Sequence, residues 1–247
     1  MKYYKKLIAI SFTLILCIFG VANVEAKEEV VFTSSNGVEL TAKEYSFLVN
    51  AYNKDFPKNM TQEEYDFFKK GNYFDSTIEK KTYTENNSKI KKGTYYSTAS
   101  KSIQITKAYS SSNCAITITA TWFGDPSIKS YDLIGAYLQN VSRVGSVLTR
   151  SYSTTSSTAP SYTKTTANGV GASIRVPTAG SNISLYQAFT TTKGGTVYAS
   201  YQHALANTTL AVSKQYNFSI IGYGNVFGFY GSAAGLYDRM NGVNISV

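Results

Sequence analysis

Short runs of alternating polar and apolar residues fill most of this chain after Gly93, and they constrain its fold more than any other feature. In the run NCAITITATWF, one side of an extended strand collects Cys114, Ile116, Ile118, Ala120 and Trp122, whereas threonines occupy much of the other side. Similar runs are GVGASIRV, NISLYQAF and YNFSII, and they are separated by turn-forming Gly, Ser, Asn and Pro residues. The pattern predicts a mainly β fold, an antiparallel β-sandwich or jelly-roll-like domain over residues 93–247.

A helical pattern precedes the β-rich region. LTAKEYSF from Leu40 and MTQEEYDF from Met60 carry the same helix-start motif. In each copy a threonine can accept a hydrogen bond from the helix start while a glutamate three residues later reaches back, which is a capping box. The pattern predicts a small α-helical hairpin within residues 27–71. Residues 72–92 show no sustained period and are predicted to be a linker.

The N-terminus is typical of a secretory signal peptide. A basic head, MKYYKK, is followed by an apolar run and by the small-residue sequence VEA, so we expect residues 1–26 to be cleaved after Ala26. A membrane anchor is the alternative, but the apolar run breaks at Asn23, before it reaches the length that a spanning helix needs. The mature chain is therefore predicted to be secreted and extracellular, without a transmembrane span.

Charge divides the mature chain into two parts. Residues 27–85 carry eight lysines against eleven acidic residues, whereas residues 86–247 carry thirteen Lys and Arg against three acidic residues. Opposite charge indicates two structural units, and the helical hairpin is either a removable prodomain or a docking module. A basic extracellular domain suits anionic surface polymers, although an ordinary soluble surface is an equal alternative. No motif predicts specific binding to nucleic acid.

Few residues are available for catalysis or metal binding. Cys114 is the one cysteine of the predicted mature chain, and His203 is the one histidine, so we expect no disulfide, no metal site and no cofactor. His203 shares a strand face with Val197, Ala199 and Tyr201, which favours a core histidine over a catalytic base. Standard catalytic motifs are missing from the sequence, so an enzyme is less favoured than a binding protein.

A resemblance supports the same interpretation. The segments TITATWFGDPSIKSYDLIGA from Thr117, GTVYASYQHA and NGVELTAKEY resemble a group of uncharacterised secreted proteins of Gram-positive bacteria. The resemblance implies secretion and a shared architecture. It implies no activity, ligand or catalytic residue.

Three functional classes follow from these features. A non-catalytic extracellular binding module for glycans or anionic surface polymers is favoured, because the chain contains 21 tyrosines and its C-terminal part is basic. The first alternative is a membrane-active, pore-forming-toxin-like protein that inserts residues 151–176. The Ser/Thr-rich part of this segment is, however, more typical of a polar loop or an exposed sheet edge. The second alternative is an extracellular hydrolase that uses Asp125, Asp132 or Asp238.

The predicted ligand-binding residues are Trp122, Tyr131, Asp132, Tyr198, Gln202 and His203. The segment WFGDPSIKSYD joins two apolar strands, and binding groups are commonly mounted on such connections at the end of a sandwich. We expect Tyr198, Gln202 and His203 to face the same groove. Trp122 has a second interpretation as a core anchor, because it shares the strand face of Ile116 and Ile118. A monomer or a weakly associating protein is expected.

Overall fold

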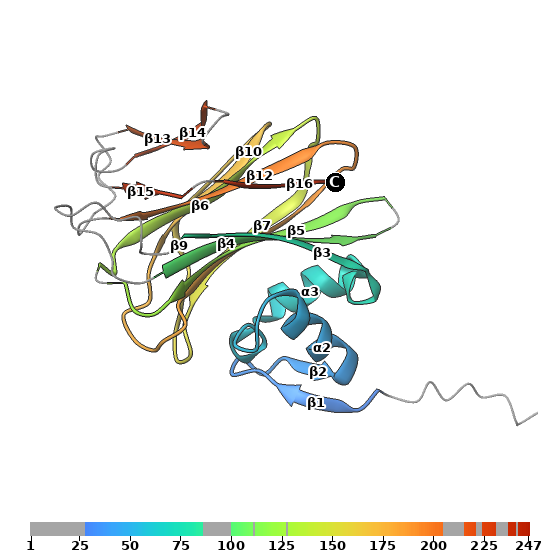
Figure 1. Cartoon of the computed structure of the whole chain (residues 1–247). Coiled ribbons are helices and arrows are strands. Elements are labelled where there is room, and N and C mark those ends of the chain that lie inside the picture. Colours follow the sequence, from blue (N-terminus) through green and yellow to red (C-terminus); the bar gives the residue numbers. More distant parts are fainter. Residues whose placement is uncertain are drawn as a thin grey trace, which may run out of the picture. The chain divides into compact units, whose positions relative to one another are not determined.

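The computed structural model describes residues 28–85, 100–110, 112–126, 128–204, 215–220, 224–230, 237–240 and 242–247 (Figure 1). The predicted signal peptide and residues 86–92 of the predicted linker lie outside the described residues. Residues Val31–Val247 form one compact unit. It is mainly β, the strand pairs of its two larger sheets are antiparallel, and a small helical segment precedes these sheets, as the sequence predicts.

The helical segment contains both predicted helix starts. Its elements are β1 (Val30–Thr33), β2 (Glu39–Thr41), α2 (Ala42–Ala51), η1 (Pro57–Asn59), α3 (Gln62–Lys70) and η2 (Tyr73–Asp75). Thr41 and Glu44 close a capping box at the start of α2, and Thr61 and Glu64 close another at the start of α3. The local sequence therefore fixes where both helices begin.

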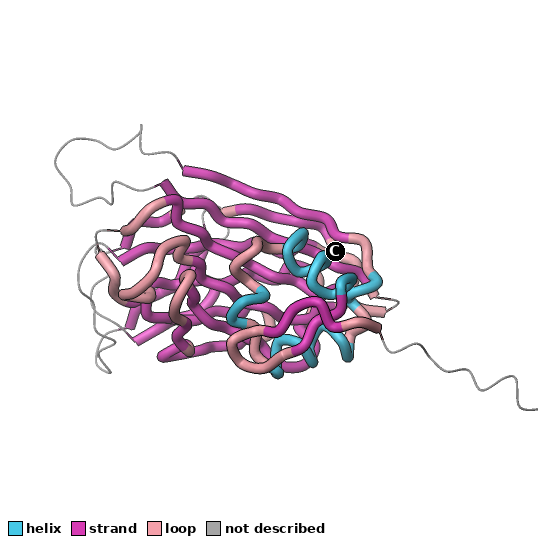
Figure 2. The backbone as a smooth tube through the Cα atoms, turned by 90° about the horizontal axis from the view of Figure 1, so that it is seen from below, coloured by secondary structure: helices cyan, strands magenta, loops and turns pink. Residues whose placement is uncertain are grey.

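Two larger antiparallel sheets follow. Sheet 1 has the order β3 (Ile78–Glu85), β4 (Ser100–Tyr109), β5 (Cys114–Phe123), β11 (Ser184–Thr191), β7 (Arg143–Tyr152) and β8 (Ser157–Thr158). Sheet 2 has the order β15 (Tyr237–Arg239), β12 (Thr196–Ala204), β6 (Tyr131–Gln139), β10 (Gly169–Arg175) and β9 (Pro160–Thr166), and β16 (Val243–Ser246) also pairs with β12. A separate hairpin consists of β13 (Gln215–Ile220) and β14 (Gly224–Tyr230). Figure 2 shows these strands in magenta and the short helices in cyan.

One hydrophobic core receives side chains from both sheets. The predicted inward face of β5, from Cys114 to Trp122, is fully buried in it, and Ile134, Ala136 and Leu138 of β6 contribute from sheet 2. Alternate residues of a strand point to opposite faces, so the same alternation leaves the threonines of β5 on the other side of sheet 1. The alternation predicted from the sequence is confirmed for this strand.

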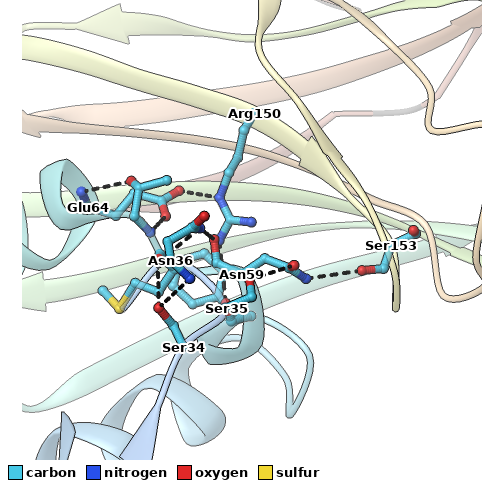
Figure 3. Close-up of polar contacts among 10 residues, drawn as sticks. Ser34, Ser35, Asn36, Asn59, Glu64, Arg150 and Ser153 are labelled. Atoms are coloured by element: carbon cyan, nitrogen blue, oxygen red, sulfur yellow. Dashed lines mark hydrogen bonds and ion pairs between the residues drawn. The ribbon is translucent and has the colours of Figure 1, made fainter. Parts of the chain in front are cut away.

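The helical segment covers the other side of sheet 1. A second apolar cluster joins Leu48, Phe56 and Phe68 to Tyr152 and Tyr186 of the sheet. Polar contacts hold the same interface (Figure 3). The Asn59 side-chain amide donates to the Ser153 carbonyl over 3.2 Å, and the Arg150 side chain forms a buried ion pair with Glu64.

Each capping glutamate has two uses. One carboxylate oxygen of Glu64 accepts from the Thr61 backbone amide, and the other accepts from Arg150 Nε. Glu44 likewise accepts from the Thr41 amide and from the Tyr65 hydroxyl, at 3.0 and 2.9 Å. The motif that starts each helix therefore also makes its tertiary contact.

The structure differs from the predicted linker over residues 72–92. Ile78–Glu85 form β3, the terminal strand of sheet 1, which pairs with β4. Two cross-strand ion pairs, Glu79 with Lys107 and Glu85 with Lys101, connect the strands. The mixed charge that suggested a linker is typical of an exposed edge strand, where it discourages pairing with other chains.

The Ser/Thr-rich segment also belongs to a sheet. Pro160–Thr166 form β9, which ends the strand order of sheet 2 and pairs with β10. Among the described helices, none combines the length and the apolar character needed to cross a membrane.

Candidate functional site

The predicted ligand-binding residues fall into two sets. Trp122, Asp132 and His203 point into the core between the sheets and are 1%, 0% and 1% exposed. Tyr131, Tyr198 and Gln202 occupy the alternate positions of β6 and β12, on the outer face of sheet 2. Tyr131 and Tyr198 are partly exposed there, whereas Gln202 is buried. The residues therefore do not line one groove.

The inner set forms a buried hydrogen-bonded network centred on the Asp132 carboxylate. That carboxylate accepts hydrogen bonds from the Tyr201 hydroxyl, from His203 Nδ1 at 3.0 and 3.1 Å, and from the Ala204 amide at 2.9 Å. Because a carboxylate only accepts, the contact assigns the proton of the His203 ring to Nδ1. Trp122 Nε1 donates to the Tyr201 oxygen over 2.9 Å, and the Trp122 and His203 ring centroids lie 4.6 Å apart.

This network ties three strands together inside the core. Asp132 lies on β6, Trp122 on β5, and Tyr201 and His203 on β12. Buried polar groups need hydrogen-bond partners, and in this network each donor group finds an acceptor on another residue. Trp122 is therefore a core anchor, as its second interpretation predicted, and it does not lie at the rim of the sheets. A ligand-binding role for these residues stays a prediction.

The outer face of sheet 2 carries two neighbouring tyrosines. Tyr137 on β6 lies directly opposite Tyr198 on β12, and their ring centroids are 6.2 Å apart at an interplanar angle of 36°. The Tyr198 hydroxyl donates to Gln139 Oε1 over 2.8 Å, which fixes the orientation of its ring. The register continues from Tyr198 to the exposed Asn244 on β16. We call Tyr137, Gln139, Tyr198 and Asn244 the tyrosine platform.

Small residues adjoin the platform on the same face. Gly169 lies opposite Tyr137, and the next row across three strands is Gly171, Gly135 and Ser200. The backbone of the β13–β14 hairpin contacts β6, β9, β10 and β12. Glycine in a strand permits the close approach of another backbone. Among the side chains that the structure describes, none hydrogen-bonds to the buried Ser200 hydroxyl. The platform is an accessible part of this face, and its two rings are partly exposed.

Three members of the platform were not among the predicted binding residues. The run YDLIGAYLQ does place Tyr131, Tyr137 and Gln139 on one strand face, so their shared orientation is present in the sequence. The pairing of β6 with β12 and of β12 with β16 is a long-range contact. No local sequence pattern predicts these strand pairings.

The two described aspartates among the hydrolase candidates lie in different surroundings. Asp125 is exposed on a turn and pairs with Lys129 at 3.3 Å, whereas Asp132 is saturated by the donors of the core network. The Asp238 side chain lies outside the described part of the chain. Within the described ranges, no three His, Cys, Asp or Glu side chains are grouped so that they could hold a metal ion.

Burial controls the chemistry of the cysteine. Cys114 is fully buried on β5, and burial raises the pKa of its thiol to about 12. The thiolate is the nucleophilic form, so burial disfavours a nucleophilic role for this cysteine.

Comparison with known proteins identifies no family. No protein-family model matches the chain, and no curated protein matches it. One similar solved structure is the crystal structure of the KRT10-binding region domain of the pneumococcal serine rich repeat protein PsrP. The two chains are 12% identical, the alignment covers 51% of this chain and 86% of that chain, and the TM-score is 0.29. A similarity of this size supports no conclusion about fold or function.

Proposed function

We propose that this protein is a secreted, non-catalytic binding module built as a β-sandwich, and that it binds extracellular glycans on the tyrosine platform. The signal-peptide pattern supports secretion, and the shared core of the two sheets supports the sandwich. The observation that carries the function is the pair of partly exposed rings of Tyr137 and Tyr198 on one sheet face.

The chemistry of the platform suits a sugar. The apolar C–H face of a sugar ring packs on an aromatic ring, while its hydroxyls hydrogen-bond to groups that both donate and accept. Tyr137 and Tyr198 supply the aromatic surface, and Gln139 and Asn244 supply side-chain amides beside it. All members of the platform are uncharged, which favours a neutral glycan over an anionic polymer.

A glycan array tests the proposal. The mature chain from Lys27 should bind a subset of neutral glycans, and the binding should persist at high salt because no ion pair is needed. Tyr137→Ala and Tyr198→Ala should each weaken it, and the double variant should abolish it. Phe123→Ala is the matched control, because it removes an aromatic side chain that is 57% exposed elsewhere on the molecule.

Three other results would favour the competing functions. Binding that is lost at high salt and is unaffected by both tyrosine substitutions would mean a nonspecific basic surface instead. Dye leakage from liposomes caused by the intact chain would favour a membrane-active protein. Turnover of a glycan that disappears in a folded Asp132→Asn variant would favour a hydrolase.

A further inference from the structure

A cleft separate from the tyrosine platform lies where the end of α3 meets sheet 1. It consists of two adjoining hollows of about 490 and 420 Å³, and Lys70, Gly71, Tyr73 and Asn113 line both of them. Both volumes are in the range of ligand sites in proteins.

The floor of the cleft is held in place by the helix end. Helix α3 stops at Gly71, where an added Cβ would overlap the Tyr73 ring, so glycine is required for this ring to pack beneath the helix. Asn72 follows in the left-handed region at φ 54° and redirects the chain. The Tyr73 ring is buried, and its hydroxyl is 3.3 Å from Thr190 Oγ1 on β11.

The first hollow, the polar arm, is lined by amides and hydroxyls. Asn72, Ser76, Ser110 and Asn113 contribute to its wall. The turn that carries Asn113 is fixed, because the Ser110 amide donates to the Asn113 carbonyl over 3.0 Å and Lys193 donates to the Ser110 carbonyl over 2.8 Å. A side-chain amide both donates and accepts, which is what a peptide backbone requires of its partner.

The second hollow, the apolar arm, combines hydrophobic and acidic side chains. Phe67, Val144 and Leu148 line it, and Val144 is 39% exposed. Glu63 and Asp66 also line it. Asp66 accepts a hydrogen bond from the neutral Gln62 amide, which leaves its charge uncompensated by that contact.

The apolar arm has an excess of negative charge among its lining residues, because Glu63 and Asp66 line it against the single lysine Lys70. In the polar arm, Asp75 is paired with Lys43, and Lys193 contacts the Ser110 carbonyl. The apolar arm therefore favours a cation that is attached to an apolar group.

We propose that this cleft binds an extended peptide segment in which an apolar residue adjoins a lysine or arginine. The apolar side chain packs on Phe67 and Val144, and the cation faces Glu63 and Asp66. The peptide backbone hydrogen-bonds to the amides of the polar arm. Aliphatic contact and charge complementarity act together in one arm, which a neutral sugar would not use.

Fluorescence anisotropy with labelled octapeptides tests this site on the mature chain. Each probe carries one leucine and one lysine, adjacent or one residue apart, on a Gly/Ser background, and its twin carries glutamate in place of lysine. The leucine–lysine probes should bind and the glutamate twins should not. The double variant Glu63→Gln/Asp66→Asn should weaken binding by about tenfold, and Val144→Ser should weaken it as well. All three positions lie on the wall of an open cleft, and circular dichroism and the unfolding midpoint verify that the variants are folded.

Asp125→Asn is the matched control, because it removes an exposed carboxylate outside the cleft and should leave peptide affinity unchanged. Absence of binding by every leucine–lysine probe, equal binding of the glutamate twins, or affinity unchanged in the double variant would each overturn the proposal. Displacement of a bound probe by a glycan, independently of Tyr137 and Tyr198 of the platform, would overturn it too, because the cleft would then be a sugar site.

Discussion

Replacing Asp132 by alanine should destabilise the fold strongly, because three buried donors lose their acceptor. The Tyr201 hydroxyl, the His203 Nδ1–H and the Ala204 amide all donate to this carboxylate, and both Asp132 and His203 are at most 1% exposed. A buried donor without a partner costs about 1–3 kcal/mol. Since the Tyr201 hydroxyl can turn, two donors are left without an acceptor, and we expect a loss of about 2–6 kcal/mol in the free energy of unfolding.

Asp132→Asn keeps one acceptor oxygen and should cost less, about 1–3 kcal/mol. Urea unfolding followed by tryptophan fluorescence measures both changes. Trp122 is the single tryptophan of the chain and its ring lies 4.6 Å from the His203 ring, so the signal reports on this part of the core. Asp125→Ala, at an exposed turn, is the control and should change stability by less than about 0.5 kcal/mol. A loss below about 1 kcal/mol for Asp132→Ala, or a larger loss for Asp132→Asn, would refute the reasoning.

Three further predictions concern the other buried groups. Cys114 should resist thiol reagents at pH 8 and react at once in denaturant, because it is fully buried and its pKa is raised to about 12 by burial; a stoichiometric colorimetric thiol assay measures this. Glu64→Ala should cost about 3–5 kcal/mol because it leaves buried Arg150 without its carboxylate, whereas Glu44→Ala loses a cap contact and the hydrogen bond from partly exposed Tyr65 and should cost about 1–2 kcal/mol; equal losses in urea unfolding would show that the ion pair is unimportant. Burial raises the pKa of Asp55, but hydrogen bonds from a lysine and an asparagine outweigh this effect and hold the pKa below its usual value. Its contribution to stability is therefore present above about pH 4 and is lost as the pH falls further, so Asp55→Asn should be less stable than the unchanged chain at pH 7 and about equally stable at low pH; a difference in urea unfolding that does not shrink on acidification would contradict this.

Local features of the fold could be predicted from the sequence because local contacts produce them. The capping boxes at Thr41 and Thr61 depend on residues three positions apart, and the buried face of β5 depends on simple alternation. The edge strand β3 could not be predicted in this way. Its charged side chains match a linker as well as a strand, and its stability depends on pairing with β4 across a segment of intervening chain.

The candidate site shows the same limit. Alternation alone separates His203 from Tyr198 and Gln202, and it also puts Trp122 inward. The sequence around Asp132 is typical of a turn, and alternation does not reveal that its side chain accepts hydrogen bonds in the core. Nor does it reveal that Tyr137 lies beside Tyr198, because the register between β6 and β12 is set by how both sheets pack.

The most direct test of glycan binding is calorimetric titration of the strongest array glycan into the intact mature chain and into the Tyr137→Ala/Tyr198→Ala variant at high salt. Glycan binding on the platform predicts measurable heat for the intact chain, none for the variant, and Trp122 fluorescence that does not change on binding, since Trp122 is buried on the inner side of the sheets. Equal affinity for both proteins, or a change in Trp122 fluorescence that follows the binding curve, would contradict it.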